Sequence, residues 1–340
     1  MPLPMPLPMT VTSFPAFRSG LSALATVAFT LVAPLASAES LMLYTSQPNT
    51  DAQQTVDAFE KAHPEIEVQW VRDGTTRLMT RLEAERAAGQ HRADVLLVAD
   101  AVSLENLRQQ DLLAQYQPEA LEHYPDALYD PEGYYFGTKQ IATGIVHHQR
   151  AAEQPQRWQD LTEPAYKGQV AMPSPLYSGA ALIHLDSMVN DERFGWAYYQ
   201  ALADNGVTPN GGNGGVLKQV AAGTKPYGVM VDFMALREKA KGSPIEFVYP
   251  EEGVSVVTEP VAIMKGAQHV EAARKFVEFL LSREGQQLVS QQGYLPARDD
   301  VSAPEGYPDR EQIKPLPFSA TRALEQAEAE KARFADIFSS

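Results

Sequence analysis

The stretch that decides the fold class is ADVLLV, residues 93–98. A continuous apolar run of this length is typical of a strand that is buried on both faces of a parallel sheet. On its N-terminal side we expect strands at 41–44 and 66–71, and helices at 51–63 and 77–88. Strands that alternate with helices in this way predict an α/β fold.

Two extended runs, residues 134–148 and 254–264, bracket the middle third of the chain. Between them the same alternation predicts a second α/β unit, with strands at 170–172 and 227–230 and helices at 180–189, 194–205 and 215–222. Further helices are expected at 270–281 and 321–335. The chain therefore crosses twice between two units, and such a hinge lets two lobes close over a ligand.

We accordingly predict a two-lobed α/β fold in which each lobe is a mixed sheet flanked by helices. Residues 39–143 and 260–340 form lobe 1, and residues 144–259 form lobe 2. Two crossing strands join the lobes.

Residues 1–38 have the pattern of a cleavable secretory signal. Arg18 is the only charged side chain in this segment, residues 21–35 are apolar, and ASA at 36–38 offers small side chains to a signal peptidase. The apolar stretch is interrupted by Pro34 and is shorter than the about 20 residues that a membrane span needs. We therefore expect cleavage after Ala38 and export of the mature protein.

The composition restricts the compartment and the partners. The sequence contains no cysteine, which excludes disulfides, thiolate metal ligands and a lipidated cysteine anchor. An exported protein without an anchor would be lost from a cell that has no outer membrane, so we expect the periplasm of a Gram-negative bacterium. The net charge of −15 argues against a nucleic-acid partner, because such proteins rely on basic surface. It does not exclude an anionic ligand, since net charge does not describe the field inside a cleft.

Several short motifs are shared with one protein family. They are LYTS at 43–46, ADV at 93–95, WQDL at 158–161, YKG at 166–168, ARKFVEFL at 273–280 and YLPAR at 294–298. In this order they resemble the cluster of type 2 periplasmic binding proteins that includes ferric-ion, thiamine, sugar-phosphate and 2-aminoethylphosphonate binders. The resemblance implies the solute-binding component of an ABC importer. Such a protein is not an enzyme, needs no cofactor, and docks on its membrane permease as a monomer.

Within this resemblance, transport of iron is disfavoured. Ferric binders of the cluster carry two adjacent tyrosines where this chain has VDFM at 231–234. Iron is a hard cation that prefers phenolate and carboxylate oxygens, so the change removes its main ligands. The tyrosine pairs at 134–135 and 198–199 read as packing aromatics. The adjacent histidines at 147–148 point to opposite faces of an extended strand, and no metal site is expected.

The expected ligand site follows from the loops. Ligands of open α/β sheets bind where parallel strands end and helices begin. Helix N-termini carry about half a positive charge and unpaired N–H groups, so they can hold an anion. The donors expected at these loops are Ser46, Thr75, Tyr177, Ser178 and Gly179. Each Ser or Thr could instead be a helix cap, but their joint occurrence favours a tetrahedral oxyanion.

Three acidic residues accompany these donors: Asp100, Asp232 and Glu259. A carboxylate directed into an anion site repels the ligand unless the ligand also carries a cation. Asp232 could instead cap the helix that starts at Phe233, and Glu259 could be a hinge residue that faces solvent. Oxyanion donors with an acidic partner match a zwitterion that has a phosphonate and an amine. Among the ligands of the family, this description fits 2-aminoethylphosphonate.

Other functions stay open at this point. The ligand could be a sugar phosphate, a phosphoglycerate, an inorganic anion, ferric ion or a polyamine, although a polyamine site would want several carboxylates and aromatic walls. An exported hydrolase is the alternative from another class. The sequence has no Gly-x-Ser-x-Gly elbow, no metal-spaced histidines and no nucleophile beside a base. The glycine-rich run at 210–215 lacks the lysine of a phosphate loop and reads as a flexible loop beside the cleft.

Overall fold

The computed structural model describes residues 39–339. The predicted signal segment, residues 1–38, and its cleavage site lie outside the described residues. Between residues 39 and 339, no helix combines the length and the apolar character that crossing a bilayer requires.

The first sheet has five strands in the order β2-β1-β3-β10-β4. Their bounds are Glu39–Thr45 for β1, Ile66–Arg72 for β2, Val95–Leu97 for β3, Phe136–Gly137 for β4 and Pro260–Ile263 for β10. β1 is parallel to β2 and β3, whereas β10 is antiparallel to β3 and β4. The helices of this part of the chain are α1 (Asn49–Ala62), α2 (Thr75–Ala87), α3 (Ala101–Gln109), α8 (Val270–Leu281) and α9 (Arg283–Gln291).

The second sheet has six strands and is organised around the long strand β5, Lys139–His148. Its other strands are β6 (Val170–Ala171), β7 (Tyr227–Val231), β8 (Ile245–Val248), β9 (Ser255–Val257) and β11 (Leu295–Pro296). β5 is antiparallel to β7, β8, β9 and β11, and β6 is parallel to β7. The accompanying helices are α4 (Gly179–Val189), α5 (Gly195–Asp204), α6 (Asn213–Ala221) and α7 (Asp232–Ala240).

Short 3-10 helices lie in the connections of both parts. They are η1 (Glu119–His123), η2 (Asp126–Leu128), η3 (Trp158–Thr162), η4 (Pro164–Tyr166) and η5 (Arg310–Gln312).

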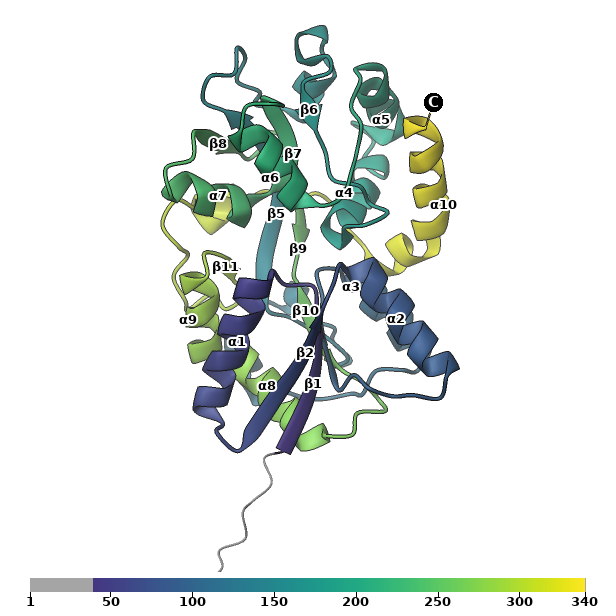
Figure 1. Cartoon of the computed structure of the whole chain (residues 1–340), viewed down its shortest axis with the longest axis vertical. Coiled ribbons are helices and arrows are strands. Elements are labelled where there is room, and N and C mark those ends of the chain that lie inside the picture. Colours follow the sequence, from purple (N-terminus) through teal and green to yellow (C-terminus); the bar gives the residue numbers. More distant parts are fainter. Residues whose placement is uncertain (1–38, 340) are drawn as a thin grey trace, which may run out of the picture. The chain divides into compact units, whose positions relative to one another are not determined.

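Two crossing strands link the sheets where the chain enters and leaves the middle third (Figure 1). β4 belongs to the first sheet and β5 to the second, and only Thr138 separates them. β9 pairs with β5, and the chain then passes Thr258 and Glu259 before β10 joins the first sheet. The predicted fold of two mixed sheets flanked by helices and joined by two crossing strands is confirmed. The residue boundaries proposed for the two lobes stay a prediction.

The last helix, α10 (Ala320–Phe338), connects elements of both parts. It packs against α3, which follows strand β3 of the first sheet, and against α4 and α5, which accompany the second sheet. Arg322 pairs with the buried Asp186 on α4 at 2.8 Å. Phe334 lies 5.7 Å from the ring of Tyr199 on α5. This helix therefore adds a connection beyond the two crossing strands.

Apolar periodicity and side-chain caps explain the main helices. On α8 the buried residues Ala272, Ala273, Phe276, Val277 and Leu280 recur three and four positions apart, which places them on one face of a helix. They pack with Leu41 and Leu43 of β1 in one core cluster. Ser282 accepts a hydrogen bond from the Gly285 amide and caps the start of α9. The sequence pattern placed seven helices within three residues of their observed bounds, gave no bounds for α3 and only a start for α7, and did not anticipate α9.

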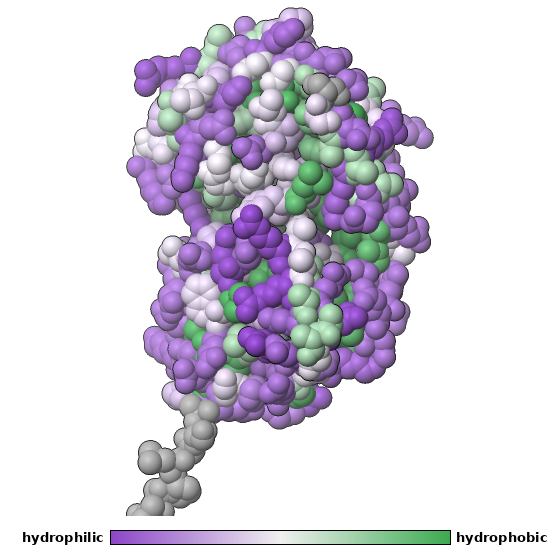
Figure 2. Space-filling model, turned by 45° about the vertical axis from the view of Figure 1, so that its right-hand side comes forward, coloured by the Kyte–Doolittle hydropathy of each residue, from purple (hydrophilic) through white to green (hydrophobic). Residues whose placement is uncertain are grey.

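The surface is largely polar. On the face in Figure 2, hydrophilic residues predominate and hydrophobic ones are scattered in small groups. Within the described part of the chain, the exposed large hydrophobic side chains are Leu176 and Val270.

Candidate ligand-binding site

A cavity of about 340 Å³ lies where loops of the two sheets meet. Its volume is at the lower end of the about 300–1,000 Å³ that is usual for small-molecule sites. Residues at or just after the carboxyl ends of β1, β2 and β3 line it from the first sheet: Ser46, Pro48, Arg72, Gly74, Thr75 and Ala99. The rest of the lining is Ile141, Tyr177, Ser178, Gly179, Ala180, Gly212, Asn213, Gly214, Gly215, Val231, Phe233, Met234 and Glu259.

Most of the predicted site residues meet at this cavity. Ser46, Thr75, Tyr177, Ser178, Gly179 and Glu259 line it, whereas Asp100 and Asp232 do not. The loops expected at the ends of parallel strands therefore do converge, and contact of these residues with a ligand stays a prediction.

Five helices begin at the cavity. The residues that precede α1, α2, α4, α6 and α7 are Pro48, Gly74, Ser178, Gly212 and Val231, and all five line it. The first turn of a helix leaves backbone N–H groups without partners in the helix, and its dipole adds positive potential. The cavity is therefore electrostatically suited to an anion.

Two serine hydroxyl groups on the lining are oriented by backbone contacts. Ser46 Oγ accepts a hydrogen bond from the Ala99 amide at 2.8 Å, which ties the loop after β1 to the loop after β3. Ser178 Oγ accepts from the Ala181 amide at 3.4 Å and caps α4. In each case the hydroxyl oxygen serves as an acceptor, so its O–H proton stays free to be donated to a ligand.

Arg72 is the cationic side chain of the lining, and the sequence reasoning missed it. Among residues 39–339, it is the only lysine or arginine that lines the cavity. Its Nε donates to the Gln47 carbonyl at 2.8 Å, which leaves the two terminal nitrogens for a ligand. The signal that could have identified it is its place at the end of β2, shortly before Thr75, which was expected at the cleft.

Glu259 is the carboxylate of the lining within the described part of the chain. It forms an ion pair with Lys139, whose side chain is almost fully buried. Gln47 Nε2 donates to the same oxygen, Oε2, at 3.3 Å. Glu259 has a φ of 38°, a strained value for a residue other than glycine, and such strain is typical of functional sites. The alternative that Glu259 is a hinge residue facing solvent does not match its relative exposure of 2%.

Asp232 is the first residue of α7, but its side chain is directed away from the cavity. Oδ1 accepts from the Phe233 amide at 2.7 Å, and Oδ2 accepts from the Tyr249 hydroxyl at 3.2 Å. Burial raises the pKa of Asp232 to about 7. Its neighbours Val231 and Phe233 line the cavity in its place. In this arrangement Asp232 is not the carboxylate that a bound ammonium group would meet.

Asp100 caps the N-terminus of α3, which is a structural role and not contact with a ligand. Its Oδ1 accepts from the Ser103 amide at 2.5 Å, and Oδ2 accepts from the Ser103 hydroxyl at 2.9 Å. Burial raises the pKa of Asp100. A methyl group on Gly179 would lie 2.8 Å from Asp100 Oδ2 and 3.2 Å from Thr75 Oγ1. Asp100 therefore occupies the space next to Gly179 at the start of α4. The start of α4 also lies close to Thr75 at the start of α2.

A family model described as bacterial extracellular solute-binding protein matches residues 91–322. The chain belongs to this family. The solute-binding protein is 27% identical over 293 residues to a protein of Salmonella paratyphi A named putative 2-aminoethylphosphonate-binding periplasmic protein; the match covers 83% of this chain and 81% of the relative.

Solved structures share the fold of this solute-binding protein at low sequence identity. The periplasmic binding protein AfuA from Actinobacillus pleuropneumoniae, with exogenous fructose-6-phosphate bound, gives a TM-score of 0.80 at 22% identity and covers 88% of this chain and 99% of its own. The ferric binding protein from Campylobacter jejuni gives a TM-score of 0.76 at 21% identity and covers 87% and 99%. The predicted family resemblance is thus confirmed.

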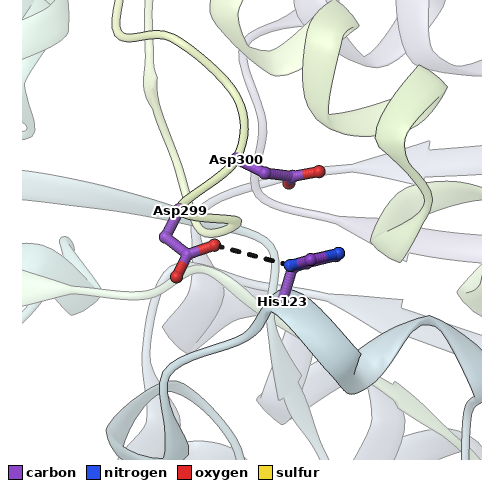
Figure 3. A group of neighbouring side chains, drawn as sticks. All are labelled: His123, Asp299 and Asp300. Atoms are coloured by element: carbon purple, nitrogen blue, oxygen red, sulfur yellow. Dashed lines mark ion pairs between the residues drawn. The ribbon is translucent and has the colours of Figure 1, made fainter.

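One cluster outside the cavity has the residue types of a metal site. His123, Asp299 and Asp300 place one ligand atom each within 4.8 Å of one another (Figure 3). His123 Nδ1 lies 3.9 Å from Asp299 Oδ1. Asp300 is already bound by Arg298, with Nε at 2.8 Å, and by Arg283 at 3.4 Å. Because these guanidinium groups compensate Asp300, the cluster gives no support for a metal site in this solute-binding protein.

One of the two tyrosine pairs considered as metal ligands, at 198–199, packs in the core. Tyr198 and Tyr199 are both buried on α5. Tyr198 contacts Phe194, and Tyr199 contacts Phe334 and Phe338. The prediction that these are packing aromatics is confirmed.

Proposed function

We propose that this solute-binding protein is the periplasmic component of an ABC importer and that it binds a small phosphonate, with 2-aminoethylphosphonate as the expected ligand. The observation that carries the proposal is the presence of Arg72 in a cavity at which five helices begin. Family membership supports a transport role, and the relative named for 2-aminoethylphosphonate supports this ligand class.

The oxyanion end of the ligand is assigned to the first turns of α2 and α4 together with Arg72. Thr75, Ser178 and Gly179 lie at these turns, and the terminal guanidinium nitrogens of Arg72 can make two parallel hydrogen bonds to one phosphonate. Neutral donors and helix dipoles can stabilise an anion in a net negative protein, because they act only at short range.

The ammonium end is assigned to Glu259 in place of Asp232. Lys139 and Gln47 both bind Oε2 of Glu259, so Oε1 is the oxygen that can accept from a ligand. Gln47 links the two ends of the site, because its carbonyl holds Arg72 and its side chain holds Glu259. Lys139 offsets part of the charge of Glu259, so Oε1 serves as a hydrogen-bond acceptor on the same cavity as the Arg72 cation. This combination favours a ligand that carries an oxyanion and a hydrogen-bond-donating ammonium group.

Sugar phosphates and phosphoglycerate are the nearest alternatives, since they present the same type of oxyanion. The fructose-6-phosphate in the AfuA structure supports this class at the level of the fold. Ferric ion is disfavoured, because the described lining offers a single phenol, Tyr177, and a single carboxylate, Glu259, with Arg72 beside them.

A thermal-shift panel of the mature protein tests the ligand class. We expect 2-aminoethylphosphonate at about 100 times its Kd to stabilise the protein by about 2.7 kcal/mol, which corresponds to a rise in Tm of about 4 °C for a chain of about 300 residues. Phosphate, glycerol phosphate, spermidine and ferric citrate complete the panel. A response to spermidine or ferric citrate alone would refute the phosphonate assignment, and a response to glycerol phosphate alone would point to phosphate esters.

A further inference from the structure

Tyr177 closes one side of the cavity by fitting between two glycines. A methyl group on Gly74 would lie 3.2 Å from the Tyr177 carbonyl oxygen and 3.4 Å from its ring atom Cζ. A methyl group on Gly212 would lie 3.0 Å from Cε1 and 3.2 Å from Cδ1 of the same ring. Neither glycine has a positive φ, and a side chain would be crowded by the Tyr177 carbonyl oxygen at Gly74 and by the Tyr177 ring at Gly212.

The two glycines belong to different parts of the molecule. Gly74 precedes α2, which packs on β1 of the first sheet, and Gly212 precedes α6, which packs on β7 of the second sheet. Tyr177, which lines the cavity, therefore contacts one segment from each of the two parts.

The loop that carries Tyr177 is held in one conformation by Ser174. The Ser174 carbonyl accepts from the amides of Tyr177 at 3.1 Å and Ser178 at 2.9 Å, and the Ser174 amide donates to the Gly211 carbonyl at 3.0 Å. Pro173 and Pro175 further restrict the backbone on either side of Ser174. The ring is thus presented by a preorganised turn.

Arg77 covers the ring from the side of α2. Its guanidinium lies 5.4 Å from the centroid of Tyr177, and 67% of its side chain is exposed. Within the described residues, Arg77 does not line the cavity whereas Tyr177 does. The aromatic ring therefore separates the cavity from a solvent-facing side chain.

We propose that Tyr177 is a specificity-determining gate, whose ring limits the size of the group that a bound phosphonate can carry. This inference rests on the proposed function. A substituent larger than aminoethyl must displace the ring from the slot between Gly74 and Gly212. Because the two glycines belong to elements of different sheets, this displacement also loosens the contact between the sheets.

Calorimetry with 2-aminoethylphosphonate and phenylphosphonate tests the gate through selectivity. We expect Tyr177→Ala to lower the preference for 2-aminoethylphosphonate over phenylphosphonate, measured as the ratio of their affinities, by about tenfold or more. Tyr177→Phe keeps the ring and should leave the ratio nearly unchanged. Leu176→Ala, at the neighbouring exposed residue, is the matched control and should resemble the wild type. An unchanged ratio in Tyr177→Ala, or the same change in both Tyr177 variants, would overturn the gate.

A second measurement does not depend on the ligand. The chain has no cysteine, so Ala180→Cys places a single thiol on the cavity lining. Adding Tyr177→Ala should speed alkylation of this thiol about fivefold or more relative to adding Leu176→Ala, because a thiol reacts in proportion to its accessibility. Equal rates would overturn the gate. If the wild type binds no phosphonate, the proposed function fails, and the alkylation rates still decide whether Tyr177 closes the cavity.

Discussion

Arg237 on α7 donates from Nη1 to both carboxylate oxygens of Asp51 on α1, at 2.9 and 3.1 Å. α7 packs on β5 of the second sheet and α1 on β2 of the first, so this ion pair joins the two parts of the molecule. Tyr294 Oη also donates to Asp51, at 2.5 Å. The guanidinium lies over the rings of Phe233 and Tyr294, at 4.7 and 4.4 Å from their centroids. Phe233 also lines the cavity, so this ion pair is linked to the candidate site through one side chain.

Breaking this pair should destabilise the folded protein. In Asp51→Asn the largely buried Arg237 loses its counter-charge, and removal of one partner of a buried pair costs about 3 kcal/mol. Urea unfolding measures the loss. Glu271→Gln removes one partner of the exposed pair with Arg274 and should change the free energy of unfolding by less than about 1 kcal/mol. Equal effects of the two substitutions would contradict the role of Asp51.

Arg72 should carry a large share of the affinity for the anion. In Arg72→Gln we expect phosphonate affinity to fall about 10- to 100-fold, since a hydrogen bond to a charged group contributes about 1.5–3 kcal/mol. Arg86→Gln, near the other end of α2, makes the same change in net charge and is the control. Calorimetry of both variants distinguishes a local contact from long-range attraction. Similar losses in the two would mean that Arg72 acts only through the overall field.

The fold could be predicted from sequence because its signals are local. The buried run at 93–98 and the apolar periodicity of α8 each fall within one short window. The loops that form the cavity were also predictable, because parallel strands place their carboxyl ends at one edge of the sheet.

The chemistry at individual positions was less accessible from sequence. Arg72 is the last residue of β2, which lies at the edge of its sheet. A charged side chain at such a position is usually interpreted as exposed to solvent. Lys139 and Glu259 are far apart in the sequence, and nothing in either segment indicates their pairing. Asp232 was expected to face the cleft, but a side chain at the start of a helix can turn either way, and here it is bound by Tyr249 and the Phe233 amide.

Asp232 should make stability depend on pH. Its pKa of about 7 in the folded protein lies above its ordinary value of 3.8, so the folded state retains a proton that the unfolded state has lost. Its contribution to stability is therefore fully present below about pH 4 and is lost as the pH rises toward 7 and above.

Asp232→Asn removes this dependence. Between pH 4 and 7 the free energy of unfolding of the variant should rise relative to wild type by about 1.4 kcal/mol per pH unit. Urea unfolding of both proteins at several pH values gives the difference between their free energies of unfolding. Groups that titrate in the same way in both proteins cancel in this difference. Gln54→Ala, which changes an exposed side chain that does not titrate, should give a constant difference. A constant difference for Asp232→Asn as well would refute the account of its burial.

Two glycines of the cavity provide a steric test. A methyl group on Gly179 would lie 2.8 Å from Asp100 Oδ2, whereas one on Gly215 would meet nothing within 4 Å. We expect Gly179→Ala to separate the starts of α4 and α2 and to weaken phosphonate binding about tenfold, since the bound anion requires donors from both helices. Gly215→Ala, whose methyl group meets no protein atom within 4 Å, should keep the starts of α4 and α2 in place and lose less affinity than Gly179→Ala. Calorimetry of the two variants measures the contrast, and equal binding would show that the closeness of α2 and α4 is not needed.

The central claim, that the cavity binds an aminophosphonate by both of its charged ends, is tested most directly by calorimetry with 2-aminoethylphosphonate and ethylphosphonate on the wild-type mature protein. The two ligands share the phosphonate and differ in the ammonium group that Glu259 is proposed to accept. We expect saturable binding of one 2-aminoethylphosphonate per protein, and binding of ethylphosphonate weaker by about tenfold or more. Equal affinities would contradict the assignment of the ammonium end, and absence of binding by both would contradict the phosphonate site itself.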